Sequence, residues 1–282
     1  MIKNSLKYLL LALLISSGLM AQVQVGSPIL GAASGDYFGE NTAINGNGTI
    51  VAGFAVNHDS NKGHVRVFLY TPTGNASWTQ MGADIDGESA SDNGNIENGS
   101  NNIALNLAGD ILAFGSVNDD GTATNAGHVR VFRYIQSPGG NGSWTQMGSD
   151  IDGEAQSDNL GVSVALSDDG HTIVIGANEH DDDGASQTGA IYVYTWNGSA
   201  WVQKGSSLHG SANHLFGNDV SVNSNGTIIA GSSRRASSNK GQVKIYQYNS
   251  SATDSWTLIG SIIGEANNDY SGASISLNSS GN

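Results

Sequence analysis

The sequence repeats itself at a nearly constant period, and this period limits the folds that the chain can adopt. A glycine in a polar turn recurs at intervals of 61, 61, 56 and 55 residues, at Gly48, Gly109, Gly170, Gly226 and Gly281. A small residue precedes each glycine by five positions, at Ala43, Ala104, Ala165, Ser221 and Ser276. Five copies therefore align without gaps over this stretch, as in propellers, solenoids and other repeat arrays.

Each copy contains short segments with the composition of β-strands. In the third copy we expect strands at 162–166, 172–177, 190–195 and 201–208. These segments are rich in β-branched and aromatic residues, and Asn, Asp, Ser and Gly separate them, as is typical of strands and turns. The fourth segment opens with a tryptophan in four copies, at Trp78, Trp144, Trp201 and Trp256. A tryptophan placed once per copy indicates packing between neighbouring copies.

Four strands in a repeat of this length predict an all-β fold, a β-propeller of four-stranded blades. The alternatives are a β-solenoid, whose repeats are usually shorter, and tandem sandwiches, which would not repeat so finely. Residues 23–31 resemble the fourth segment at 201–210, so a lone fourth strand is expected at the start of the domain. The fifth copy stops after its first strand. We therefore expect a C-terminally truncated propeller over residues 22–282, with four complete repeats and a partial fifth.

Residues 1–21 have the layout of a secretory signal peptide. Lys3 and Lys7 form a basic start, an apolar run extends from Tyr8 to Ile15, and the small residue Ala21 closes the segment. This order of charge, apolar run and small residue is typical of export signals. A membrane span needs about 20 apolar residues, so the run is too short for one. We expect a secreted or cell-surface protein; the alternatives are an N-terminal anchor or a buried helix.

Composition excludes several classes of protein. The formal net charge is −14, which argues against nucleic acid and anionic membrane surfaces as partners. The chain has no cysteine, which excludes disulfide scaffolds and cysteine-ligated metal sites. Its 39 glycines are about twice the usual share of ~7%. Many of them fall at the recurrent turns, where glycine supplies a positive φ at little cost.

Several short motifs resemble the FG-GAP-like repeats of secreted bacterial proteins, which are related in pattern to the integrin α-chain propeller. The residues that carry the resemblance are Phe38-Gly39, Phe216-Gly217, and the segments 174–177 and 189–194. The third copy has Leu160-Gly161 instead, and the proline of the family motif is absent. The resemblance covers nearly all of residues 22–282. It implies a seven-bladed propeller that mediates adhesion or carries a passive binding surface.

The resemblance also implies calcium, bound by an Asp-rich loop between the first and second strands. In the third copy of this chain, that turn consists only of residues 167–170, and it has too few carboxylates to hold calcium. The loop at 179–184 fits better, because Glu179, Asp181 and Asp183 alternate before Gly184. Alternate carboxylates before a sharp glycine turn can wrap a hard cation. Calcium is thus the one cofactor that the sequence suggests, and a solvated acidic loop is the alternative.

A second acidic motif occurs twice, on the linker between a fourth strand and the next first strand. Its carboxylates are Asp84, Asp86 and Glu88 in one copy and Asp150, Asp152 and Glu154 in the next. The linker would place both copies on one rim of the ring. They are candidate cation ligands; alternatively, such residues cap turns and accept backbone N–H bonds.

No constellation for catalysis is recognisable in the sequence. There is no Gly-x-Ser-x-Gly, no cysteine nucleophile and no His-Glu-x-x-His, and no pair of acids is singled out for glycoside hydrolysis. His64 and His128 share one strand position, but Ala190 and Gln242 replace them in later copies, which favours a surface role. We expect a non-enzymatic propeller that binds a protein or glycan at the cell surface. The alternatives are a polysaccharide-acting enzyme and a calcium-stabilised structural array.

Overall fold

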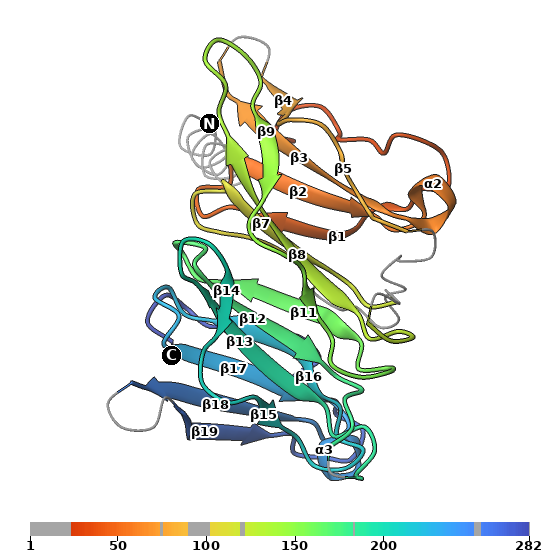
Figure 1. The fold of residues 1–282 in the computed structure, drawn as a ribbon, viewed down its shortest axis with the longest axis vertical. Helices are drawn as coiled ribbons and strands as arrows, with labels where there is room; N and C mark the ends of the chain where they lie inside the picture. Colours follow the sequence, from red (N-terminus) through yellow and green to blue (C-terminus); the bar gives the residue numbers. More distant parts are fainter. Residues whose placement is uncertain are drawn as a thin grey trace, which may run out of the picture.

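A computed structural model describes residues 24–73, 76–89, 102–118, 122–182, 184–250 and 255–281. Within these ranges the chain is almost entirely β-structure, arranged as successive antiparallel sheets (Figure 1). The segment interpreted as a signal peptide, residues 1–21, lies outside them. The elements α2 (His58–Asn61) and α3 (Ala236–Asn239) contain left-handed residues and are turns rather than regular helices. In the described part of the chain, no helix has the length and apolar character needed to cross a membrane.

Four sheets follow one another along the chain, and we call them blades one to four. Blade one contains β1 (Phe38–Ile44), β2 (Ile50–Ala55), β3 (His64–Thr71), β4 (Ser77–Gln80) and β5 (Ile85–Asp86). Blade two contains β6 (Ile103–Leu105), β7 (Ile111–Ser116), β8 (His128–Ile135), β9 (Ser143–Gln146) and β10 (Ile151–Asp152). Blade three contains β11 (Leu160–Leu166), β12 (Thr172–Ala177), β13 (Ala190–Trp196), β14 (Trp201–Gln203) and β15 (Leu208–His209). Blade four contains β16 (Phe216–Val222), β17 (Ile228–Ser233), β18 (Gln242–Asn249) and β19 (Ser255–Ile263). Each blade is an antiparallel meander, so the prediction of a propeller built from four-stranded blades is confirmed.

The fourth strand differs from its expected form in the first three blades. In blade three the single strand expected at 201–208 is two short strands, β14 and β15, which both pair with β13. The interruption falls at Gly205, whose φ is +71°, outside the range of extended strands. Gly82 and Gly148 interrupt blades one and two in the same way, with φ of +72° and +77°. In blade four β19 is one continuous strand that pairs with β18 from Ser255 to Ile263, with a bulge at Ile259.

The recurrent tryptophans join neighbouring blades, as the sequence predicts. Each indole N–H donates to the main-chain carbonyl of the residue directly after β4, β9 or β14 of the preceding blade: Trp144 to Met81, Trp201 to Met147 and Trp256 to Lys204, all at 2.8 Å. In blade one the Trp78 indole donates to the Val25 carbonyl at 3.0 Å. The segment around Val25 therefore occupies the place of a fourth strand before blade one, although it forms no strand within the described residues.

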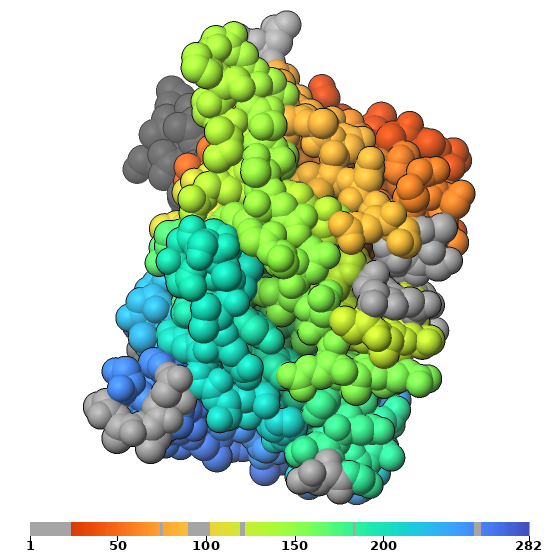
Figure 2. Space-filling model, in the orientation of Figure 1, coloured from red at the N-terminus to blue at the C-terminus, as the bar shows by residue number. Residues whose placement is uncertain are grey.

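The hydrophobic core lies between the blades as well as within them. One cluster combines residues of blades one and two, a second combines blades two and three, and a third combines blades three and four. Phe114 illustrates the contact, because its ring packs against Phe54 of blade one and stacks on Phe132 of blade two. In the space-filling view, successive parts of the sequence accordingly lie against one another (Figure 2). Packing of this kind makes each blade depend on its neighbours.

Candidate functional site

The first strands of the blades meet along a cleft of about 610 Å³. Its walls come from β1, β6, β11 and β16, together with residues 275–277 of the fifth repeat. In a propeller this is the position of the central channel. Most of the lining side chains are aliphatic or small and polar. Among the described residues that line the cleft, Asp168 is the one that carries a charge.

One end of the cleft is framed by hydrogen bonds that run from blade to blade. The Gly46 N–H donates to the Leu107 carbonyl, and the Leu107 N–H donates to the Asp168 carbonyl. The Asp168 N–H in turn donates to the Ser224 carbonyl at 3.0 Å. These bonds come from the polar turn between the first and second strands, which explains why this turn recurs so regularly. Beside them Ile44 and Leu107 line the cleft with exposed fractions of 62% and 54%.

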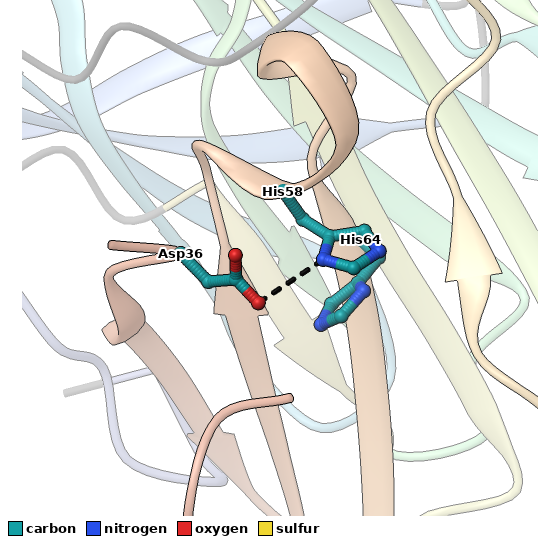
Figure 3. Close-up of side chains that lie close together, drawn as sticks. All are labelled: Asp36, His58 and His64. Carbon is teal, nitrogen blue, oxygen red and sulfur yellow. Dashed lines mark hydrogen bonds and ion pairs between the residues drawn. The ribbon is translucent and has the colours of Figure 1, made fainter. Parts of the chain in front are cut away.

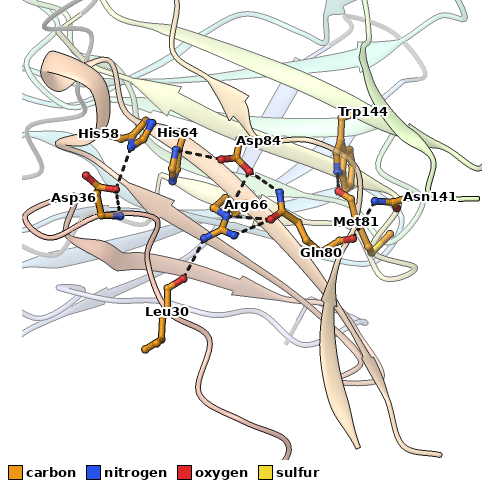
Figure 4. Close-up of polar contacts among 11 residues, drawn as sticks. Leu30, Asp36, His58, His64, Arg66, Gln80, Met81, Asp84, Asn141 and Trp144 are labelled. Atoms are coloured by element: carbon orange, nitrogen blue, oxygen red, sulfur yellow. Dashed lines mark hydrogen bonds and ion pairs between the residues drawn. The ribbon is translucent and has the colours of Figure 1, made fainter.

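Asp84 of the first acidic motif lies against basic groups of its own blade (Figure 4). Asp84 Oδ1 is 3.4 Å from Arg66 Nε, and the Gln80 amide also donates to it. Asp84 Oδ2 lies 3.7 Å from His64 Nδ1. Asp86 follows on β5, where it pairs with His64 across the sheet. The arrangement holds the linker against β3.

Two further carboxylates of the acidic motifs, those of Glu88 and Asp150, lie beside Arg130 of blade two. Glu88 reaches across from blade one, with 3.6 Å between its Oε1 and Arg130 Nη2. Asp150 Oδ1 lies 3.9 Å from Arg130 Nε. Asp152 pairs across the sheet with His128, and Glu154 follows two residues later. Within the described residues, neither motif brings three of its carboxylate oxygens within 4.8 Å of one another. Their role as cation ligands stays a prediction.

The acidic loop at 179–184 has partners within the protein. Asp181 Oδ1 accepts the Gln187 N–H at 2.7 Å. Asp182 Oδ2 lies 3.3 Å from Nδ1 of His209, which comes from β15. Glu179 is half-buried, and Asp183 lies outside the described residues. Calcium binding by Glu179, Asp181 and Asp183 also stays a prediction, and it would compete with these contacts.

An aspartate–histidine pair occupies the same corner of blades one and three. The aspartate lies two residues before the first strand, and the histidine lies three residues after the second. Asp36 Oδ2 is 3.0 Å from His58 Nδ1, and Asp158 Oδ1 is 3.2 Å from His180 Nδ1. The Asp158 carboxylate beside Nδ1 raises the pKa of His180, and the hydrogen bond from His58 lowers the pKa of Asp36.

His64 adds a third group to the corner of blade one (Figure 3). Its side chain is fully buried, and that of His128 is 2% exposed, so the surface role expected for both histidines is wrong. The reason is that the first residue of the third strand lies beneath the linker that folds back onto it. Burial lowers the pKa of His64, and neither of its ring nitrogens has a hydrogen-bond partner. One ligand atom each from Asp36, His58 and His64 lies within 4.8 Å of the other two.

Asp219 is a further buried acid, in the first strand of blade four. Burial raises its pKa to about 6. Its Oδ2 accepts the Ile275 N–H at 2.7 Å and so joins blade four to the fifth repeat. The contact is structural, since it satisfies a backbone donor between repeats.

A comparison with protein families identifies the repeat. Residues 150–194, from the end of blade two to the third strand of blade three, match the model described as FG-GAP repeat. The match covers one repeat and, together with the four successive blades, confirms the resemblance to FG-GAP-like propeller repeats. No curated protein sequence matches the chain.

Solved structures that resemble the chain do so at low identity. Sqt1 of Chaetomium thermophilum is 18% identical, with a TM-score of 0.45, over 73% of this chain and 43% of that chain. Hydrazine synthase of Kuenenia stuttgartiensis is 11% identical, with a TM-score of 0.45, over 88% and 52%. The periplasmic gluconolactonase PpgL of Pseudomonas aeruginosa is 13% identical, with a TM-score of 0.47, over 81% and 58%. The chain spans about half the length of these proteins.

Proposed function

Because the chain is built of FG-GAP-like propeller repeats, we propose that it is an exported, non-catalytic binding module that holds a protein ligand in its central cleft. The lining of the cleft carries the proposal. Small and aliphatic side chains from five repeats form a concave surface, and exposed Ile44 and Leu107 stand at its framed end. Concave, mostly apolar surfaces with a few polar groups are the usual form of binding sites. The signal-like segment at residues 1–21 supports export.

The charges of the molecule favour binding over catalysis. Glycoside hydrolysis requires two carboxyl groups about 5 to 9.5 Å apart. The cleft offers Asp168 as the one acid among its described lining residues. The carboxylates near the outer strands, such as Asp84 and Asp150, lie instead against Arg66 and Arg130. The polysaccharide-acting enzyme considered from the sequence therefore has less support than the binding module.

The chemistry of the cleft also favours a protein over a glycan. No aromatic ring is present among the described lining residues, so a sugar has no flat face on which to stack. Aliphatic side chains such as Val164 and Leu166 suit the apolar side chains of an extended polypeptide. At the cell surface such a module would serve adhesion or display.

The proposal is tested with peptide and glycan arrays probed by the labelled chain. We expect binding to a subset of peptides rich in aliphatic residues. Leu107→Glu, within the cleft, should weaken this binding at least about tenfold, because a charge would replace an apolar contact. Ile135→Glu is the matched control, because Ile135 is 50% exposed at the end of β8 and does not line the cleft. Binding to glycans with release of sugar, or equal losses in both variants, would contradict the proposal.

A further inference from the structure

Blade one contains a fully buried histidine whose ring nitrogens have no hydrogen-bond partner, beside a second histidine and an aspartate. We propose that Asp36, His58 and His64 bind one divalent transition-metal ion of the Zn²⁺ class. The site lies apart from the cleft and from the acidic loop at 179–184, so it is independent of the proposed ligand binding. It is also independent of the calcium predicted from the sequence.

Three separate elements deliver the ligands to one point. Asp36 lies in the turn before β1, His58 begins the α2 turn after β2, and His64 is the first residue of β3. Asp36 Oδ2 and His58 Nδ1 are 3.0 Å apart, and the two imidazole rings are 3.9 Å apart between centroids. Ligand atoms about 2.1 Å from a tetrahedral metal lie about 3.4 Å from one another. The separation of Asp36 Oδ2 and His58 Nδ1 is close to this value, and one ligand atom of each of the three residues lies within 4.8 Å of the other two.

The state of His64 is the observation that a metal explains. Its ring is buried, and a buried polar nitrogen without a partner costs free energy. Asp84 Oδ2 lies 3.7 Å from Nδ1, close to hydrogen-bond distance but beyond it. If Nδ1–H turns to Asp84, Nε2 is left for the metal, and both nitrogens are satisfied. A carboxylate behind a metal-bound histidine is a common arrangement, because it fixes the tautomer and the ring orientation.

Asp84 is itself well placed for this orienting role. Arg66 lies on its other oxygen at 3.4 Å, and Gln80 donates to the same atom. Figure 4 shows this chain of contacts running from Arg66 through Asp84 to His64. The first copy of the acidic motif, to which Asp84 belongs, is thereby connected to the metal site without supplying a direct ligand.

Blade three shows what the corner is without the third ligand. It keeps the pair Asp158 and His180 at 3.2 Å, so the pair alone is a structural feature of the repeat. Ala190 takes the place of His64 at the start of the third strand. His209 approaches His180 from β15, but its Nδ1 is 3.3 Å from Asp182 and it also contacts a serine hydroxyl. Of the described residues, only those of blade one converge as metal ligands.

The donor set determines the class of metal. Two imidazoles and one carboxylate suit Zn²⁺ and its neighbours in the first transition series, whereas Ca²⁺ takes six to eight oxygen ligands. The His58 side chain is 29% exposed, so solvent reaches the site and an ion can enter. Three protein ligands leave a fourth position for water. The site therefore anchors the corner of blade one and keeps one exchangeable coordination position.

The test is calorimetric titration of the chelator-treated full chain with zinc chloride. We expect one Zn²⁺ per chain. His58→Ala should lower the affinity by at least about 100-fold, more than Asp84→Asn, for which about 10-fold is expected of a residue that orients a ligand. His180→Ala is the matched control, because it removes the same kind of pair from blade three, and it should leave the affinity unchanged.

A second readout keeps the test decisive if a variant is unstable. Co²⁺ bound by histidine absorbs visible light, and this absorption should appear in the wild-type chain and in His180→Ala, and disappear in His58→Ala. Circular dichroism verifies that each variant is folded. No zinc binding by the wild-type chain would overturn the proposal. Equal losses in His58→Ala and His180→Ala would overturn it as well, because zinc binding would then not be specific to the Asp36, His58 and His64 site of blade one.

Discussion

Blades one and three have the same arrangement of strands and differ at the corner formed by the turn before the first strand, the turn after the second and the start of the third. In both, an aspartate before the first strand holds a histidine after the second strand, at 3.0 Å in blade one and 3.2 Å in blade three. In blade one His64 lies beside the pair, and in blade three Ala190 occupies that strand position. One residue therefore separates a structural pair from three converging metal ligands. A repeat protein can place chemistry in a single blade without changing its frame.

The largest effect on stability should come from Gly176 of blade three, where the backbone of the next blade approaches closely. At Gly53, in the second strand of blade one, a side chain approaches instead. A Cβ added at Gly176 of blade three would lie 2.0 Å from the Gly217 carbonyl oxygen, which is backbone of the next blade. At Gly53 of blade one it would meet the end of the Phe38 ring at 2.5 Å, which can rotate away. We expect Gly176→Ala to cost about 3 kcal/mol of unfolding free energy and Gly53→Ala about 1 kcal/mol. Urea denaturation of both variants measures this, and equal costs would show that the blades are not closely apposed there.

An intermediate effect on stability should come from the aspartate–histidine pair of blade three, Asp158 and His180, and it should depend on pH. The Asp158 carboxylate, 3.2 Å from Nδ1, raises the pKa of His180 above its unfolded value of 6.5. The pair therefore stabilises the fold fully below that value, and the contribution is lost as pH rises through the folded pKa. We expect His180→Gln to cost about 1 kcal/mol at about pH 5.5 and less at about pH 8.

Thermal melts of His180→Gln at the two pH values test this expectation. His171→Gln, on the exposed turn before β12, is the control for a histidine outside the corner. A cost that is constant with pH would contradict the assignment of the pair. Direct NMR titration of the His180 ring would then locate its proton.

The smallest effect should come from calcium. Binding at the loop of Glu179, Asp181 and Asp183 competes with the contacts that Asp181 makes to Gln187 and Asp182 makes to His209. We expect calcium to raise the melting midpoint by less than zinc does, and Asp181→Asn to abolish the rise. Thermal melts with calcium and with chelator measure this rise. An unchanged melting midpoint would contradict the prediction of calcium at this loop.

Because the sequence repeats, the strand positions and the packing between blades could be predicted from it. Strand boundaries in blade three follow the pattern closely, and β12 covers the expected residues 172–177. Trp201 was expected between blades and lies there, because a large ring placed once per repeat must pack somewhere that also repeats. The split of the fourth strand was not predictable, since Gly205 looks like any other glycine until its φ is known.

The candidate metal site depends on contacts that no local pattern encodes. Asp36 and His58 are 22 residues apart, and His64 appears in sequence as a polar residue at the start of a strand. Only the folded corner shows that His64 is buried. A useful signal was present nevertheless: the Asp and His positions recur in blade three, at Asp158 and His180, at the same offsets from the strands.

The most direct test of the difference between the two corners is diffraction at the zinc absorption edge from crystals grown with zinc. We expect one strong anomalous peak in blade one, between Asp36, His58 and His64, and none between Asp158 and His180. A peak of equal height at both corners, or none in blade one, would contradict it.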